Sequence, residues 1–559
     1  MTLYAVYLVF TLMDAFQLIE PKPSATGSIF GFAEYLASLA LFLVIMTSSD
    51  FRYRYRLSLT KTDLRKVGFW VALGIGTALL LIDWWYQNGF PTFKFLANPS
   101  NPKAALALIL LGSVAYLISV AVIRPPTFTK RNAHQFLSAN YHFIHEGNPE
   151  RLQVIAEELQ RSLEPLFRLY TGFPTPSRKN EEQEPPQEQR YAHDFFLLLG
   201  DHRFCSVVVS KVPTFAIACF EEAQKHPHQQ LPISPFVRNV GQEFIRNKNS
   251  AFYHEISGYD SGLIGYTRPI TNTIYGHYDF IETYSRNAHS PLEMNYRDEF
   301  DGEQFEAYAR ASLTFFKSYL QETGGRARSQ AFFAVHRSFE HANMGIHKLD
   351  DVEEYHLEPP YARLQATVDF LKEAIELLDK HAQRPRNLRV SEIAQRDTYD
   401  LVAELVFETI FAVSMVSSPG WTNWAVQHNA VFSKIFGLGG EATHKIIGHK
   451  VRRLIYDEIM EMNKYPNFKG ARLLGYCLNV LGIKSMDRRK SHRSEFYPLQ
   501  VLAVKWVKEN YKRLLEDSPK VALACLHGTI TYDKTNHRLI KTYAGDTQKE
   551  APQDFLDLD

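Results

Sequence analysis

The sequence predicts a mainly α-helical membrane protein, with four N-terminal transmembrane helices, a large α-rich cytoplasmic domain and a small C-terminal β-hairpin. Three observations lead to this fold class. Four hydrophobic segments lie within residues 1–125, and the rest of the 559-residue chain is mostly polar. That polar part repeats apolar residues at helical spacing. Near its end, TITY and HRLIKTY are two alternating runs joined by a short polar turn, which is typical of a hairpin.

The hydrophobic segments have the lengths that membrane helices need. A helix requires about 20 residues to cross a hydrocarbon layer about 30 Å thick. The first segment is the shortest; it carries Asp14 and Gln17 and lacks the basic start of a signal peptide. Acids inside a span are functional candidates, and we note Asp14 and Asp83, although both lie near segment ends. The four segments are 3–19, 28–46, 67–86 and 104–123.

The basic residues of the loops predict the orientation. Nine of them lie in the loop 48–66 and just after the fourth segment, whereas the two other loops hold only three. Cytoplasmic loops carry the excess of Lys and Arg. We therefore expect the loop 48–66, the large domain and both termini in the cytoplasm. A bacterial inner membrane fits this arrangement.

Two groups of residues are predicted at the membrane interface. The sequence RYRYR places Arg52, Arg54 and Arg56 beside the cytoplasmic headgroups. Residues 1–131 carry 12 basic and 6 acidic residues, an excess that suits anionic lipid headgroups as partners. On the opposite side, Trp84 and Trp85 suit the outer interface, where amphipathic rings settle.

The remaining composition excludes some classes of protein. Residues 132–559 carry 50 basic and 55 acidic residues, so nucleic-acid binding is not expected. The four cysteines form no CxxC pair and fall on the predicted cytoplasmic side, where thiols stay reduced. No Walker A loop, dinucleotide fingerprint, GxSxG elbow or kinase motif set is present. We therefore expect no cofactor and no metal.

The chain after the fourth segment divides at composition changes. Asn148-Pro149 is an N-cap followed by proline at the first helical position, and Leu152, Ile155 and Leu159 continue one apolar face. Residues 173–190 hold four prolines and many charges, which is typical of a flexible linker. Gly324-Gly325 marks a second break. The predicted parts are the anchor 1–125, a helical connector 126–172, the linker 173–190, a mixed, mainly α subdomain 191–325 and an α-helical subdomain 326–559 ending in the hairpin and a mobile acidic tail.

Long helices are predicted to dominate the last subdomain. The run around Asp400, Glu404 and Glu408 keeps these acids on one stripe, and too few uncharged residues follow to cross a membrane. We interpret it as an amphipathic or central core helix. The expected helices are 358–383, 391–416, 421–436, 441–462, 467–481 and 496–515.

One segment, 253–284, differs from its surroundings because it is rich in glycine and tyrosine and is predicted to be irregular. Irregular loops held by a scaffold often carry function. We predict a ligand site there with Arg268 as its central group, since a guanidinium suits an anionic ligand. A packed connecting loop, braced by pairing of Arg268 with an acid, is the alternative. The predicted site residues are Arg268, His254, Glu255, Asp260 and His277.

The function expected from these patterns is that of a non-enzymatic membrane protein. Its cytoplasmic domain would bind or sense a cytosolic partner. Small residues in the third and fourth segments allow close helix contact, either within a compact four-helix unit or at a dimer interface, and we expect a homo-oligomer. Two alternatives remain open. One is a membrane-bound hydrolase or nuclease that uses the His, Glu and Asp groups of 253–347, including His336, Glu340, His341 and His347. The other is an oligomeric pore or transporter.

Overall fold

The computed structural model is mainly helical (72%) and ends in a small antiparallel sheet of three strands. It describes residues 18–19, 32–37, 39–40, 50–62, 64–96, 98–171, 185–226, 231–255, 268–287, 289–294, 300–385, 387–392, 395–437, 442–484, 495–543 and 551–558. The chain forms two compact units, Met1–Pro232 and Ile233–Asp559. Each unit is described here by itself.

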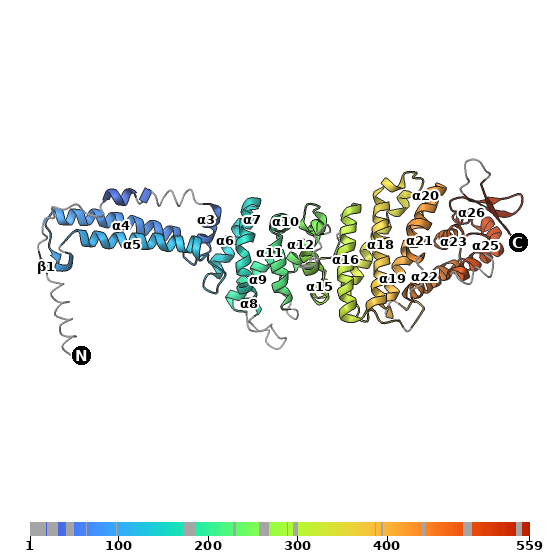
Figure 1. Cartoon of the computed structure of the whole chain (residues 1–559), viewed down its shortest axis with the longest axis horizontal. Coiled ribbons are helices and arrows are strands. Elements are labelled where there is room, and N and C mark those ends of the chain that lie inside the picture. The colour runs from blue at the N-terminus through green and yellow to red at the C-terminus, as the bar shows by residue number, and fades with distance from the viewer. Residues whose placement is uncertain are drawn as a thin grey trace, which may run out of the picture. The chain divides into compact units, whose positions relative to one another are not determined.

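The first unit contains the apolar helices and the helices that follow them (Figure 1). Its short strands β1 (Leu18–Ile19) and β2 (Thr92–Phe93) pair antiparallel. Its helices are α3 (Phe51–Ser58), α4 (Leu64–Gln87), η1 (Lys94–Leu96), α5 (Ser100–Ile118), the π-helix η2 (Ser119–Ile123), α6 (Ala133–Glu146), α7 (Pro149–Leu159), η3 (Gln160–Ser162), α8 (Leu163–Thr171), α9 (Gln187–Leu199), α10 (His202–Lys211) and α11 (Pro213–Gln224).

Helices α4 and α5 lie side by side and are the two long, apolar helices of this unit (Figure 1). Lys66–Gln87 and Ser100–Ile123 are each long and apolar enough to cross a membrane. The third and fourth hydrophobic segments are therefore helical over the predicted lengths. The first two segments, with Asp14, fall mostly outside the described residues. Of the second, residues 32–37 are helical, and Tyr35 packs between α4 residues with its hydroxyl donating to the Ala72 carbonyl at 2.6 Å.

An ion pair joins the two apolar helices at one end. Lys103 Nζ of α5 lies 2.5 Å from Asp83 Oδ1 of α4. Lys103 is buried (8% exposed), whereas the Asp83 side chain is about a third exposed. The sequence places Asp83 near the end of its segment, and the structure adds a basic partner on the neighbouring helix.

Taken together, helices α10 and α11 are also long and apolar enough to cross a membrane. They are bent by 110° at Val212-Pro213. Pro213 occupies the first turn of α11, as its sequence position predicted. Both helices pack against others of the unit, α10 on α7 and α11 on α8, so their apolar faces serve as core.

The packing divides the chain at a different place from the predicted linker. Residues 172–184 lie outside the described part, but the last four residues of the predicted linker already belong to α9. That helix packs on α6 and α8. Because α9 to α11 complete the core begun by α6 to α8, the boundary between compact units falls after Pro232, not at 173–190.

The second unit packs long helices in sequence and closes with a sheet (Figure 1). Its helices are α12 (Ser234–Arg246), α13 (Ala251–His254), α14 (Pro269–Tyr275), α15 (Tyr278–Ser285), α16 (Gly302–Thr323), α17 (Gln330–Asn343), η4 (Ile346–Leu349), η5 (Tyr355–Leu357), α18 (Pro359–His381), α19 (Thr398–Val413), α20 (Gly420–Trp424), the π-helix η7 (Ala425–Phe432), α21 (Ser433–Phe436), α22 (Ala442–Glu461), α23 (Phe468–Leu481), α25 (Tyr497–Asp517) and α26 (Pro519–Leu523).

Most of the long helices predicted for this unit are present, with small shifts in their ends. Gly324 and Gly325 both have positive φ, at 62° and 73°, and end α16 as the predicted break requires. Helix α19 begins at Thr398 rather than 391, because Asp397 forms a capping box there. Asp400 is fully buried, which confirms the core assignment of this helix.

The C-terminal sheet contains the predicted hairpin and a further strand. Strands β3 (Ile530–Asp533) and β4 (Arg538–Thr542) form the hairpin, and β5 (Gln553–Asp557) pairs antiparallel with β4. The prediction of a mobile acidic tail is therefore wrong for β5. Leu556 lies opposite Leu539 and both are buried, so two apolar side chains hold the acidic strand in register.

Candidate functional site

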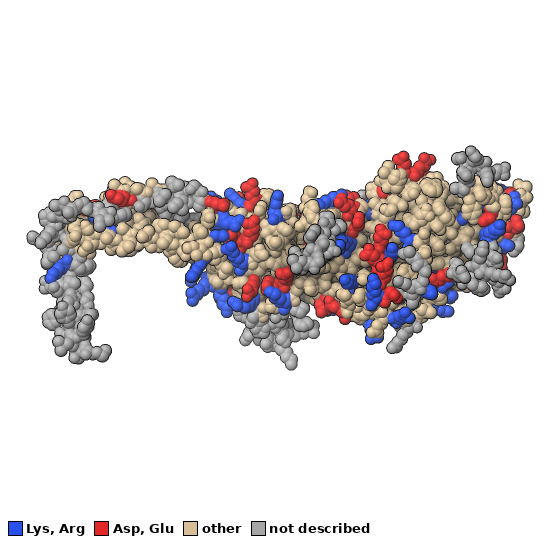
Figure 2. Space-filling view, in the orientation of Figure 1, with Lys and Arg blue, Asp and Glu red and all other residues tan. Residues whose placement is uncertain are grey.

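The surface of α4 and α5 is apolar and exposed. On the face shown in Figure 2 these helices are almost free of Lys, Arg, Asp and Glu, whereas charged side chains crowd over α6 and α7. Trp70, Leu108 and Leu111 are each about two thirds exposed. Water does not favour such a large contiguous apolar surface, so these helices need another environment, as a bilayer would provide.

Beside these helices the basic loop predicted at 48–66 is partly helical. Residues 51–58 form α3, so the RYRYR sequence does not present its arginines as an extended strip. Helical spacing puts Arg52 and Arg56 four residues apart on one face. Tyr55, which shares the turn with them, is fully buried.

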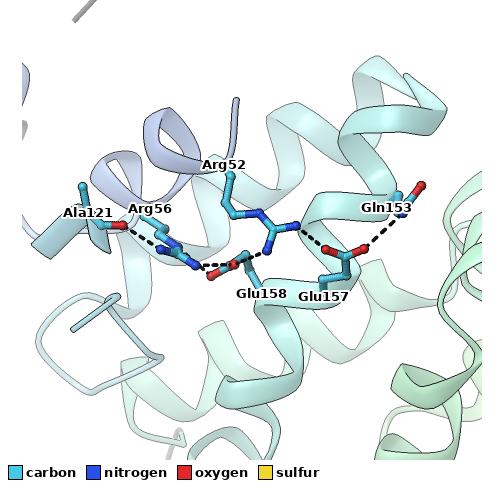
Figure 3. Close-up of polar contacts among 6 residues, drawn as sticks. All are labelled: Arg52, Arg56, Ala121, Gln153, Glu157 and Glu158. Atoms are coloured by element: carbon cyan, nitrogen blue, oxygen red, sulfur yellow. Dashed lines mark hydrogen bonds and ion pairs between the residues drawn. The ribbon is translucent and has the colours of Figure 1, made fainter. Parts of the chain in front are cut away.

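The face formed by Arg52 and Arg56 meets two acids of α7 (Figure 3). Arg56 binds Glu158 in a bidentate manner, with Nε 2.8 Å from Oε2 and Nη2 2.7 Å from Oε1. Arg52 pairs with Glu157 and places Nη1 3.4 Å from Glu158 Oε1. Gln153 donates to Glu157 at 3.1 Å. We call the set Arg52, Arg56, Ala121, Glu157 and Glu158 the clamp.

Arg56 also reaches the end of the second apolar helix. Its Nη1 donates to the Ala121 carbonyl at 2.7 Å. Ala121 belongs to η2, whose last carbonyls have no partner within the helix. A cation at a helix C-terminus is also favoured by the helix dipole. One guanidinium therefore ties together α3, the end of the α5–η2 helix and α7.

Burial makes the loss of one member of this pair more costly than in a surface ion pair. Arg56 is 7% exposed and Glu158 is 8% exposed. The hydrogen bonds that Arg56 donates to Glu158 raise the pKa of Arg56 above its ordinary value, so the guanidinium stays charged. Removing one member of a buried pair costs about 3–5 kcal/mol, because the other charge is left without a partner. By contrast, Arg52 and Glu157 are each about a third exposed, and their pairing is worth less.

Neutral contacts reinforce the same junction. Tyr55 donates to Asn140 Oδ1 of α6 at 2.8 Å, and both side chains are fully buried. Burial raises the pKa of Tyr55, which keeps it a neutral donor. Asn132, just before α6, donates to the Leu59 carbonyl after α3 at 3.1 Å. The chain between the second and third hydrophobic segments is thus joined to the helices after the fourth.

The other residues predicted for the membrane interface lie apart from the clamp. Trp84 and Trp85 sit at the opposite end of α4 and are about half exposed. Trp85 Nε1 donates to the Pro91 carbonyl at 3.3 Å. Contact with lipid headgroups stays a prediction for Arg52, Arg54, Arg56, Trp84 and Trp85, with Arg52 and Arg56 already engaged by carboxylates.

The predicted ligand loop 253–284 is largely helical where the structure describes it. Residues 256–267, which include Asp260, lie outside the described part. The carboxylate of Glu255 accepts from Ile270 N at 2.6 Å and from Thr271 N at 3.0 Å, so it caps the start of α14. Arg268 is the residue before that helix, and His254 and His277 are exposed at the ends of α13 and before α15. The expectation of an irregular segment is wrong for α13 to α15, because Pro269 and the Glu255 cap start a helix there.

Three histidines of the hydrolase alternative, His254, His277 and His336, lie in or beside different helices. His336 is buried in α17, with Nδ1 3.5 Å from Glu340 Oε1, and this contact lowers the pKa of Glu340. His254 and His277 lie at exposed helix ends. Among the described residues, no group of three or more His, Cys, Asp or Glu side chains is placed to hold a metal ion.

The sequence reasoning missed the acids of the clamp, although one signal pointed to them. Glu158 follows Ile155 by three residues and precedes Leu159, so it lies on the apolar face of α7. A carboxylate on a face that becomes buried needs a cation. The partner, however, lies 102 residues earlier, and helical spacing could not identify it. Comparisons of the chain found no matching family model, no similar curated protein and no similar solved structure.

Proposed function

We propose that this chain is an integral membrane protein whose cytoplasmic helical part binds or senses a cytosolic partner and is held at the membrane by its N-terminal helices. The proposal takes the four hydrophobic segments as spans, with both termini in the cytoplasm. It describes a non-enzymatic regulator or effector. The observation that carries it is the buried Arg56 contact, which joins α3 and the end of the α5–η2 helix to α7.

The contact supports this proposal because it connects α7 rigidly to α3 and to the end of the α5–η2 helix. An anchor that only tethers a domain needs no buried ion pair, since a flexible linker suffices. Here a bidentate pair with low exposure fixes the first cytoplasmic helices against the membrane end of the apolar helices. A displacement on either side of this junction therefore has to break the pair or carry the other side with it.

Membrane topology provides the first test. We would introduce single cysteines at Lys61, Asn88 and Lys317, all exposed positions, and label intact cells with a membrane-impermeant maleimide. The four native cysteines are buried, so they serve as a low background. Only Asn88→Cys should react. Labelling of Lys61→Cys or Lys317→Cys contradicts the cytoplasmic assignment.

Partner binding provides the second test. A photo-crosslinking amino acid at Lys317, compared with one at Asn88, should capture a cytosolic protein in living cells only from the first position. The cross-linked protein should remain with the membrane fraction after alkaline carbonate washing, which releases peripheral proteins. A chain that itself washes off the membrane, or equal capture at both positions, would contradict the proposal.

A further inference from the structure

A cavity in the second unit has the chemistry of an anion site. Its volume is about 230 Å³, and it lies beside the end of α17, the short helix η4 and the first turns of α18. Phe305 and Phe300, both buried, and Met344 form an apolar wall. Pockets that hold small molecules combine such walls with a few fixed polar groups.

The polar groups of this cavity are basic. His341 ends α17, His347 and Lys348 belong to η4, and Arg363 comes from α18. None of the described residues that line the cavity is acidic. Within the described part of the chain, neither Lys348 nor Arg363 forms an ion pair with a carboxylate. Two cationic side chains, the half-buried Arg363 and the exposed Lys348, therefore line this cavity.

The orientation of these groups is partly set by the backbone. Arg363 Nη1 donates to the Phe300 carbonyl at 3.1 Å, which holds the plane of the guanidinium. Its Nη2 lies close to Gly345, where an added Cβ would be 3.2 Å away. His347 Nδ1 lies 2.6 Å from the Met344 carbonyl and must donate to it, because a carbonyl oxygen only accepts. A guanidinium held in this way can offer its remaining N–H groups to a carboxylate or phosphate.

We propose that this cavity binds a small organic anion. Its apolar body would rest on Phe300 and Met344, and its carboxylate or phosphate head would bind Arg363 and Lys348. The inference goes beyond the proposed function, because it concerns the second unit alone and holds whether or not the chain spans a membrane. The cavity also brings together His341 and His347, which the sequence analysis considered only for the hydrolase or nuclease alternative.

The test uses the full-length chain in detergent and two anionic probes, benzoate and phenyl phosphate, followed by isothermal titration calorimetry. At least one should bind saturably. Inorganic phosphate, which lacks the apolar body, and benzyl alcohol, which lacks the charge, should both bind more weakly than phenyl phosphate. Absence of saturable binding of both anionic probes up to about 10 mM, or benzyl alcohol binding as well as the anions, overturns the proposal.

Variants separate the cavity from the rest of the surface. Arg363→Gln should weaken the anionic probe about tenfold or more, as expected for a lost charge-assisted contact. Arg337→Gln is the matched control, because Arg337 is an exposed arginine of α17 outside the cavity. Lys348→Gln repeats the test at an exposed side chain, in case Arg363→Gln disturbs the Phe300 contact. Equal affinity of the wild type, Arg363→Gln and Lys348→Gln would place the probe elsewhere and refute the site.

Discussion

Arg56 and Glu158 are 102 residues apart in the chain, yet they form a buried bidentate ion pair with contacts of 2.7 and 2.8 Å. The same guanidinium donates to the Ala121 carbonyl, so a single side chain touches three segments of the first unit. Both charges have lost most of their water, so removing either one leaves the other buried without a partner and destabilises the fold. This dependence makes the junction sensitive to single substitutions.

Neutralising Arg56 should therefore destabilise the first unit strongly. For Arg56→Gln we expect a loss of about 3–5 kcal/mol, because Glu158 is left as a buried charge without its partner. Thermal unfolding of the detergent-solubilised chain, followed by circular dichroism, measures the effect. Arg52→Gln is the matched control, with an expected loss of about 0–1 kcal/mol at its more exposed position. Equal losses in the two variants would show that the Arg56 contact contributes no more to stability than the exposed Arg52 contact.

The ion pair between the apolar helices offers a second prediction. Lys103→Met should lower the midpoint of thermal unfolding in detergent, because Asp83 then loses its basic partner on α5. The loss should be about 1 kcal/mol, since the Asp83 carboxylate is about a third exposed. The exchanged pair Asp83→Lys with Lys103→Asp should recover part of it. Failure of the exchange to improve on Lys103→Met would mean that the lysine stem, not its charge, stabilises the contact.

A buried pair also organises the core of the second unit. Lys450 Nζ lies 2.6 Å from Asp400 Oδ1, and both side chains are fully buried. Lys450 also donates to the Asn387 and Arg389 carbonyls. Lys450→Met should cost about 3–5 kcal/mol in chemical denaturation, since it leaves the Asp400 charge in the core.

The double variant Lys450→Met with Asp400→Asn distinguishes charge from packing. It should be more stable than Lys450→Met alone, because asparagine keeps the shape of Asp400 and removes the unpaired charge. Lys434→Met is the control, since Lys434 pairs with Asp369 at the surface and should cost about 0–1 kcal/mol. A double variant no more stable than Lys450→Met would show that the unpaired Asp400 charge does not cause the loss.

The buried histidine His527 should make the stability of the second unit depend on pH. Burial lowers the pKa of His527 to about 3, from 6.5 in an exposed histidine. Between these two values the unfolded chain binds a proton that the folded chain does not, so the free energy of unfolding falls as the pH falls below 6.5. The contribution of this group should be about 1.4 kcal/mol per pH unit in that window.

The matched variants are His527→Gln and His356→Gln. The first should reduce the slope of stability against pH between about 4 and 6, although it lowers stability at pH 7 by disturbing the core. The second replaces an exposed histidine and should leave the slope unchanged. Urea denaturation at several pH values measures both. An unchanged slope in His527→Gln would show that other groups cause the acid sensitivity.

Much of the local structure could be predicted because it depends on neighbouring residues. Asn148 caps α7, Pro213 starts α11, and Gly324 and Gly325 end α16, as their positions in the sequence indicated. Capping and turn formation use hydrogen bonds within a few residues, so the sequence carries the whole signal. The prediction of an irregular segment at 253–284 failed because α14 is capped by Glu255, which precedes that helix by more than the 12 residues 256–267. A cap so distant in the sequence gives no local signal.

Composition and a spacing of about 3.6 residues per turn were enough to predict which helices are apolar enough for a membrane and where most long helices begin and end. The role of the basic loop, by contrast, depends on how the chain packs. In the sequence, RYRYR is a basic segment that is predicted to set the topology and has no specific partner. In the structure the same residues belong to α3, which buries Tyr55 and places Arg56 in contact with Glu158. Ion pairing between distant segments depends on which faces are buried together, and only packing fixes that choice.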